Sequence, residues 1–199
     1  GFTLANLFFG IFAIVAASRG DFDAAARFIV FGAIADTLDG RIARATKSGT
    51  RFGEELDSLV DAISFGTAPA LIMYFAVFQS TRWEWIFCFF FTACAVMRLA
   101  RFNVNTGVVD KRYFQGLPSP AAAALVMGFI WLMTDLGFAP LDNRWLMFVV
   151  CLYAGLTMVS NVPFYSFKDF QMRKSVPFTV IVSIALVIAL INIHPPTVL

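Results

Sequence analysis

Long apolar stretches separated by short polar connections form the main pattern of this 199-residue chain. About seven stretches can be marked, and each approaches the ~20 residues that a helix needs to cross ~30 Å of hydrocarbon. They cover residues 2–18, 24–44, 54–78, 83–102, 119–135, 145–165 and 175–193. The pattern predicts an all-α fold, a polytopic transmembrane helical bundle that forms a single domain over residues 1–199.

Composition supports a membrane environment for these stretches. Hydrophobic residues make up 59% of the chain and charged residues only 14%, whereas a soluble domain normally carries about a quarter charged residues. The net charge of +2 is too small to indicate a nucleic-acid partner. Because Gly1 already lies in an apolar run, we expect that a short N-terminal piece is missing before it.

The basic residues indicate how the bundle is oriented, because cytoplasmic connections carry an excess of Lys and Arg. Eleven lie around the connections that follow the second, fourth and sixth stretches: Arg41, Arg44, Lys47, Arg51, Arg98, Arg101, Lys111, Arg112, Lys168, Arg173 and Lys174. Only four lie on the opposite side: Arg19, Arg27, Arg82 and Arg144. We therefore expect an integral protein of the cytoplasmic or inner membrane, with the connection between the second and third stretches facing the cytoplasm.

Four aspartates interrupt the apolar pattern on either side of that connection. Asp36 and Asp39 are three residues apart, and Asp57 and Asp61 are four apart. On helices, both spacings place the pair on one face, and the basic, glycine-containing turn between them allows the two faces to oppose each other. We expect the four carboxylates to converge in an active site between the second and third stretches, at the cytoplasmic side.

Carboxylates this close together repel one another unless a cation lies between them. Oxygen ligands without His or Cys favour Mg²⁺ or Mn²⁺ over zinc. Four carboxylates suit two such ions, ~3.5–4 Å apart, that clamp a displacement at phosphorus. Nearby small residues leave a cleft for a base and ribose, and nearby basic residues add positive charge for phosphates. These residues are Gly40, Ala43, Gly53, Arg44, Lys47 and Arg51.

Two other interpretations of the acids stay open. The aspartates could pair with the neighbouring arginines as interfacial anchors. Intramembrane carboxylates also occur in cation transporters and channels, where they lie near the bilayer midplane on broken helices, often with repeat symmetry. Here the acids lie at helix ends without a repeat, which favours an enzyme that binds a nucleotide.

The spacing Asp36-x2-Asp39-Gly40-x2-Ala43-Arg44-x8-Gly53-x3-Asp57-x3-Asp61 resembles the complete signature of the CDP-alcohol phosphotransferases. The resemblance implies an enzyme that displaces CMP from a CDP-linked lipid with the hydroxyl of an acceptor alcohol. It implies that the four aspartates hold the metal ions, that Asp61 is also the catalytic base, and that the enzyme is a homodimer. The residues implied to line the CDP-lipid are Asn6, Gly40, Ala43, Arg44, Thr50 and Gly53; Thr3 and Asn6 resemble the polar pair of the family's first helix.

Other motifs must indicate the acceptor, because the signature does not specify it. ISFGTAPA at 63–70, RLARFN at 98–103, FQGLPSPAA at 114–122 and SFK at 166–168 together resemble the membrane-integral phosphatidylserine synthases. This resemblance implies transfer of a phosphatidyl group from CDP-diacylglycerol to L-serine. A sister enzyme acting on inositol phosphate, glycerol 3-phosphate or choline, or one using an ether-lipid donor, stays as an alternative.

L-Serine carries a carboxylate that needs a cationic partner near the metal site. Arg98 and Arg101 share one helical face, and Arg98 lies inside an apolar stretch, where a charge is costly without a purpose. Ser119 before Pro120 is typical of an N-cap, and the free N–H groups of that turn can hold an anion. Lys168 is a further candidate. Each of these residues also has a plainer role open to it, as a snorkelling anchor or as a helix start.

Overall fold

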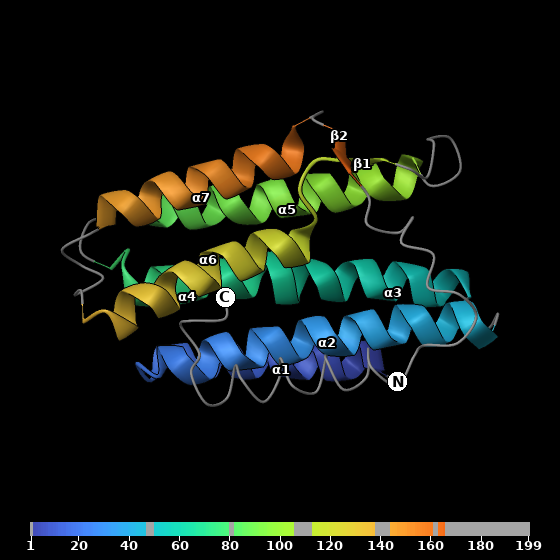
Figure 1. Ribbon diagram of the computed structural model, residues 1–199, viewed down its shortest axis with the longest axis horizontal. Coiled ribbons are helices and arrows are strands. Elements are labelled where there is room, and N and C mark those ends of the chain that lie inside the picture. The colour runs from blue at the N-terminus through green and yellow to red at the C-terminus, as the bar shows by residue number, and fades with distance from the viewer. Residues whose placement is uncertain are drawn as a thin grey trace.

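A computed structural model describes residues 2–46, 50–79, 82–105, 113–137, 144–160 and 163–165 of the chain. These residues form a bundle of long helices in three layers, with α1 and α2 in one layer, α3, α4 and α6 in the middle, and α5 and α7 in the third (Figure 1). The helices are α1 (Phe2–Ser18), α2 (Phe22–Thr46), α3 (Arg51–Asp61), α4 (Ala68–Ala76), α5 (Trp85–Asn105), α6 (Ser119–Asp135) and α7 (Arg144–Val159).

A tight turn joins α1 and α2 into an antiparallel hairpin. Gly20 in this turn has φ 82°, a left-handed conformation that glycine adopts without steric cost. The side chain of Asp21 then accepts a hydrogen bond from the backbone N–H of Ala24 at 2.9 Å, which satisfies a free donor at the start of α2. Further along, the rings of Phe12 and Phe28 pack edge to face with their centroids 4.5 Å apart. The hairpin brings the first turn of α1 beside the last turns of α2.

The central rod is one continuous helix over Arg51–Ala76, built from α3, a π-helix η1 (Ala62–Thr67) and α4. Thr50 begins it as the N-cap, since its hydroxyl accepts a hydrogen bond from the backbone N–H of Gly53 at 3.1 Å. The π-helix starts directly after Asp61. Because π-turns insert an extra residue into a helix and often mark functional sites, the rod changes its helical phase at the aspartate.

Two segments, Arg51–Ala76 and Trp85–Val104, are long and apolar enough to cross a membrane, and α1, α6 and α7 are shorter apolar helices. Many small residues such as Ala13 and Ala95 lie in the core, and many large apolar side chains such as Phe8 (60% exposed) lie on the outside. This distribution suits lipid surroundings, where helices approach through small residues. The predicted helical character is confirmed, and the two long apolar segments are consistent with the predicted membrane association. The number of seven spans stays a prediction, and the last predicted stretch, 175–193, lies outside the described residues.

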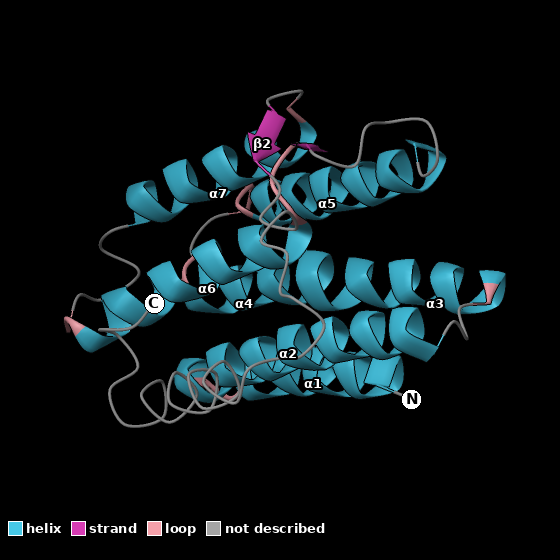
Figure 2. Ribbon diagram, turned by 45° about the vertical axis from the view of Figure 1, so that its right-hand side comes forward, coloured by secondary structure: helices cyan, strands magenta, loops and turns pink. Residues whose placement is uncertain are grey.

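The all-α prediction did not include two short strands. β1 (Tyr113–Gln115) and β2 (Pro163–Tyr165) pair antiparallel, with Phe114 opposite Phe164, at the edge of the bundle beside α5 and α7 (Figure 2). The prediction that the sixth stretch runs to residue 165 was therefore wrong, because α7 ends at Val159. Pro163 lacks a backbone N–H and disfavours helical geometry in the residue before it, so the helix cannot continue through this position.

The loop between β1 and α6 packs tightly against the end of α7. Gly116 in this loop has φ 81°, and a Cβ placed there would lie 2.3 Å from the carbonyl oxygen of Met158. The next residue, Leu117, donates its backbone N–H to the carbonyl of Thr157 at 3.0 Å. These contacts fix the start of α6, and therefore Ser119, relative to the third layer of the bundle.

Candidate active site

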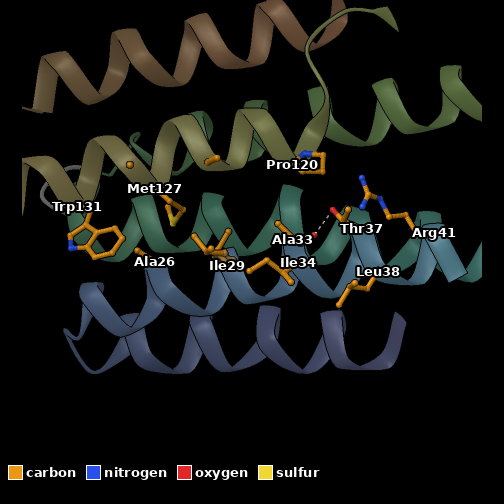
Figure 3. A pocket seen from close by; sticks show the side chains of 13 residues that line it. Ala26, Ile29, Ala33, Ile34, Thr37, Leu38, Arg41, Pro120, Met127 and Trp131 are labelled. Atoms are coloured by element: carbon orange, nitrogen blue, oxygen red, sulfur yellow. Dashed lines mark hydrogen bonds between the residues drawn. The ribbon is translucent and has the colours of Figure 1, made fainter. Parts of the chain in front are cut away.

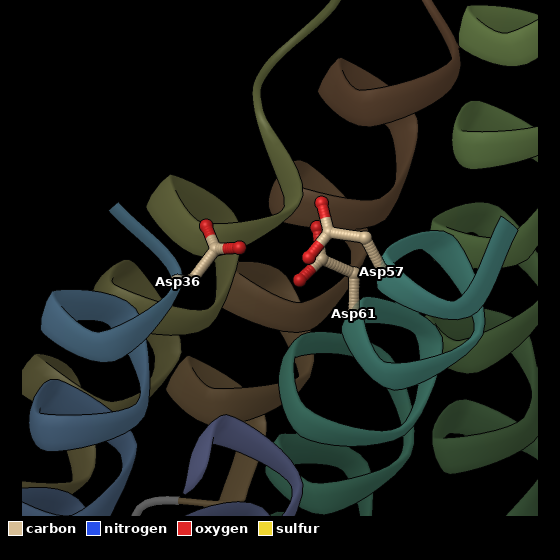
Figure 4. Close-up of side chains that lie close together, drawn as sticks. All are labelled: Asp36, Asp57 and Asp61. Atoms are coloured by element: carbon tan, nitrogen blue, oxygen red, sulfur yellow. The ribbon is translucent and has the colours of Figure 1, made fainter. Parts of the chain in front are cut away.

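Three carboxylates converge where the end of α2 meets α3. Asp36 projects from α2, and Asp57 and Asp61 project from successive turns of α3 towards it (Figure 4). Each offers one carboxylate oxygen, and these three oxygens lie within 4.8 Å of one another. All three side chains are half-buried. The spacing of four residues in α3 puts its two aspartates on one face, as predicted, and the helix pairing supplies the third.

Asp39 lies outside this group of three. Its Oδ2 accepts a hydrogen bond from the backbone N–H of Thr3 at 2.9 Å and another from the Thr3 hydroxyl. Thr3 lies in the first turn of α1, where backbone N–H groups lack partners within the helix and attract a carboxylate. The predicted convergence of four carboxylates therefore holds for three of them in this arrangement, while the fourth faces the N-terminus of α1.

The chemistry of the three carboxylates suits a divalent cation. Among the residues whose side chains the structure describes, none of the three forms an ion pair within 4.0 Å with a Lys or Arg. The salt bridge found there joins Arg144, at the start of α7, to Glu84 in the turn before α5. Half-buried like charges without a paired cation repel one another, and a hard cation with oxygen ligands removes that repulsion. The residues present therefore fit a site for Mg²⁺ or Mn²⁺.

Asn6 approaches the carboxylates from α1. Its side chain is fully buried, and its Nδ2 donates to Oδ1 of Asp61 at 3.4 Å. The sequence assigned Asn6 only a place beside the CDP-lipid, by resemblance. Contacts of this kind join residues far apart in the chain and leave no periodic signal, which is also why the partners of Asn6 on other helices could not be predicted.

The remaining residues expected around the CDP-lipid lie at the ends of α2 and α3. Thr50 and Gly53 are joined by the N-cap hydrogen bond of α3, so the Thr50 hydroxyl has a structural role that the resemblance did not include. A Cβ at Gly53 would lie 3.2 Å from that hydroxyl oxygen. Gly40, Ala43 and Arg44 lie in the last two turns of α2; the side chains of Ala43 and Arg44 are outside the described part of the structure.

Arg98 and Ser119 meet beside the acidic group. Nη1 of Arg98 donates to the Ser119 hydroxyl oxygen at 2.9 Å, and the guanidinium carbon lies 5.8 Å from the centroid of the Phe102 ring. The positive charge of Arg98 is close enough to Asp61 to stabilise the negative charge of that carboxylate. The serine hydroxyl is fully buried, so the arginine is held from α6 while it faces the carboxylates from α5.

The prediction that Ser119 is an N-cap was wrong. The cap position is Pro118, whose carbonyl accepts the first helical hydrogen bond from Ala122 at 3.0 Å, and Ser119 is the first residue inside α6. Its hydroxyl therefore turns to Arg98 rather than to the backbone of its own helix. Arg101, one turn further along α5, donates to the carbonyl of Val159 at 3.3 Å. Lys168 lies outside the described residues.

An apolar groove of about 340 Å³ lies between α2 and α6. Trp131 lies at one end of the groove, and Arg41 and Thr37 lie at the other end (Figure 3). Thr37 directly follows Asp36 in α2, so this second end is the one nearer to the acidic group. The Thr37 hydroxyl donates to the carbonyl of Ala33 at 2.8 Å, so it presents little polarity to the groove. The lining suits hydrocarbon, with one positive charge at its mouth.

The fold, the aspartate spacing and the acidic group together define a class of enzyme. Residues 1–165 match the CDP-alcohol phosphatidyltransferase family, and the chain belongs to that family. Among its relatives is a CDP-diacylglycerol–serine O-phosphatidyltransferase of Helicobacter pylori, 38% identical over 189 residues, covering 94% of this chain and 79% of the relative. Enzymes of the same name from Saccharomyces cerevisiae and Methanocaldococcus jannaschii are both 34% identical, covering 90% and 84% of this chain and 62% and 73% of the relatives.

Proposed function

We propose that this protein is a phosphatidylserine synthase, which transfers a phosphatidyl group from CDP-diacylglycerol to the hydroxyl of L-serine and releases CMP. The observation that carries the proposal is the group of three convergent carboxylates with Arg98 beside Asp61. A phosphoryl-transfer site needs the acids, and an amino-acid acceptor needs the nearby cation. The names of the relatives support the same donor and acceptor.

The aspartates would hold the cofactors. Asp36, Asp39, Asp57 and Asp61 would bind two divalent cations, Mg²⁺ or Mn²⁺, with Asp39 oriented by Thr3. When bound, such ions neutralise the diphosphate of the donor and stabilise the charge that develops at phosphorus. The helix ends next to the acids, with Gly40, Ala43, Arg44, Thr50 and Gly53, would hold the cytidine diphosphate. The groove along α2 and α6 offers a surface for the donor's acyl chains.

Asp61 would take the proton of the acceptor. A serine hydroxyl holds its proton tightly at neutral pH, so a carboxylate within hydrogen-bond reach accelerates attack. The serine oxygen forms a bond to the phosphorus of the phosphatidyl group, and the bond from that phosphorus to the CMP oxygen breaks. CMP leaves with the bonding electrons, and the proton passes from serine to Asp61 and then to solvent.

Arg98 would bind the carboxylate of serine. Its guanidinium is oriented by the Ser119 hydroxyl and lies on the Asp61 side of α5, so it can hold the acceptor while the hydroxyl faces the base. An arginine that makes several hydrogen bonds to a carboxylate adds geometric specificity as well as charge. Arg101 and Lys168 are further candidates for this pocket.

The remaining features of the proposal concern the whole protein. We propose a single membrane-embedded domain over residues 1–199, with the acidic group facing the cytoplasm. Serine and CMP are water-soluble, so a site on this side can exchange both with the aqueous phase. We also propose a homodimer. The excess of Lys and Arg at this end supports the orientation.

An assay of CMP release tests the proposal. Purified protein with CDP-diacylglycerol and Mg²⁺ or Mn²⁺ should release CMP when L-serine is added, and should form phosphatidylserine in equal amount. Parallel reactions with inositol phosphate, glycerol 3-phosphate and choline are the controls. CMP release with one of these acceptors but not with serine would refute the assignment of serine while keeping the reaction class.

A further inference from the structure

Asn6 lies where α1, α2 and the central rod meet. Its side chain is 0% exposed, so in this structure it is closed to any nucleotide or headgroup. Nδ2 donates to Oδ1 of Asp61 at 3.4 Å, and the backbone carbonyl of Asn6 accepts from the hydroxyl of Ser64 at 3.2 Å. A single residue of α1 therefore contacts both Asp61 and the π-helix that follows it.

Two glycines make room for these contacts. A Cβ at Gly32 of α2 would lie 2.9 Å from Oδ1 of Asn6, and a Cβ at Gly10 of α1 would lie 2.6 Å from the hydroxyl oxygen of Ser64. Both distances are shorter than Cβ atoms tolerate. The packing of α1 on α2 and on the rod is therefore shaped around the Asn6 amide and the Ser64 hydroxyl.

The side-chain oxygen of Asn6, unlike its nitrogen, gains no hydrogen bond among the described residues. Oδ1 of Asn6 is buried and has no hydrogen-bond partner among the described residues. A buried acceptor without a partner destabilises a fold, and an apolar side chain of similar size would avoid that cost. The contact that distinguishes asparagine from such a side chain is the one from Nδ2 to Asp61.

We propose that Asn6 is a positioning residue for Asp61. The amide donates to Oδ1 and so limits rotation of the carboxylate, which leaves Oδ2 free of that bond. The inference rests on the proposed function in that Asp61 is taken as the base and as a metal ligand. It replaces the role of Asn6 as a direct ligand of the CDP-lipid, which its complete burial does not support.

Substitutions at Asn6 test the idea through metal affinity and kinetics. In Asn6→Ala we expect kcat and the affinity for Mn²⁺, followed by electron paramagnetic resonance, to fall roughly 10- to 100-fold, as is typical when a group that orients a metal ligand is removed. The KM for CDP-diacylglycerol should not change. Asn6→Asp should lower kcat further, because it places a second carboxylate against Asp61. Ser18→Ala, which removes a hydroxyl bound to Val15 at the far end of α1, is the control and should leave both quantities unchanged.

Gly32→Ala distinguishes a specific effect on the Asn6 amide from a general loss of packing. Alone, its Cβ displaces the Asn6 amide, so we expect a loss of kcat and Mn²⁺ affinity similar to that of Asn6→Ala. In the Asn6→Ala background the clashing oxygen is gone, and the other nearest atoms lie at 3.8 Å. Gly32→Ala should then add no further loss, and a double-mutant cycle measures this coupling.

Several outcomes would overturn the inference. One is a raised KM for CDP-diacylglycerol with unchanged kcat in Asn6→Ala, which would return Asn6 to the donor site. Another is an additive loss in the double mutant. If Asn6→Ala does not fold, Gly32→Ala, whose Cβ displaces the Asn6 amide, tests the same contact, and unchanged kcat and Mn²⁺ affinity in that variant would refute the inference. If the wild-type protein releases no CMP with serine, the proposed function fails, while the Mn²⁺ affinities still decide whether Asn6 positions Asp61.

Discussion

Replacing Arg98 by Ala is the substitution that separates binding of the acceptor from the rest of the reaction. The guanidinium is held by a 2.9 Å hydrogen bond to the buried Ser119 hydroxyl and lies over Phe102, so it is fixed before any ligand arrives. A hydrogen bond between charged groups contributes about 1.5–3 kcal/mol. At 1.36 kcal/mol per tenfold change, its loss should lower kcat/KM for serine roughly 10- to 150-fold.

The effect should appear mainly as a raised KM for serine. The KM for CDP-diacylglycerol should change little, because Arg98 projects from α5 whereas the proposed donor site lies at the ends of α2 and α3. Ser119→Ala keeps the arginine but frees its side chain, so we expect an effect in the same direction and smaller. Arg101→Ala is the comparison within α5: its guanidinium donates to Val159, so the change for serine should be smaller than in Arg98→Ala.

The assay measures the initial rate of CMP release over a range of serine concentrations at saturating CDP-diacylglycerol. A second series varies CDP-diacylglycerol at saturating serine. A raised KM for the lipid with an unchanged KM for serine would refute the reasoning and move Arg98 to the donor site. Unchanged kinetics for both substrates would leave Arg98 only its structural contact with Ser119.

Three further predictions concern the acids and the loop before α6. In Asp61→Asn, turnover should fall by more than the ~10²–10⁴-fold typical of a general base alone, while CDP-lipid binding measured by calorimetry survives; near-normal turnover would exclude Asp61 as the base. Chelation with EDTA should abolish CMP release, and added Mg²⁺ or Mn²⁺ should restore it, whereas activity that persists after chelation would contradict the metal assignment. Gly116→Ala forces a Cβ against the Met158 carbonyl at positive φ, so we expect a cost of about 1–3 kcal/mol, seen as a lower Tm in detergent; an unchanged Tm would show that the loop moves without cost.

The sequence alone determined the class of fold and the nature of the chemistry. Apolar stretches of membrane-spanning length are visible in one dimension, and their predicted bounds at 2–18 and 119–135 coincide with α1 and α6. The aspartate spacing was equally readable, because a helix repeats every 3.6 residues and residues three or four apart must share a face. This local geometry was enough to indicate a divalent metal site, and the resemblance of the whole aspartate motif indicated the family.

Tertiary structure decided which of those side chains meet. Thr3 is 36 residues from Asp39, Asn6 is 55 residues from Asp61, and Arg98 is 21 residues from Ser119. Such contacts depend on how each helix is rotated about its axis and how closely two helices approach. The π-helix after Asp61 changes the phase of the central rod, while Gly10 allows α1 to approach the rod closely and Gly32 allows α2 to approach α1 at Asn6. Periodicity places a residue on a face of its own helix, but only packing decides which neighbour that face meets.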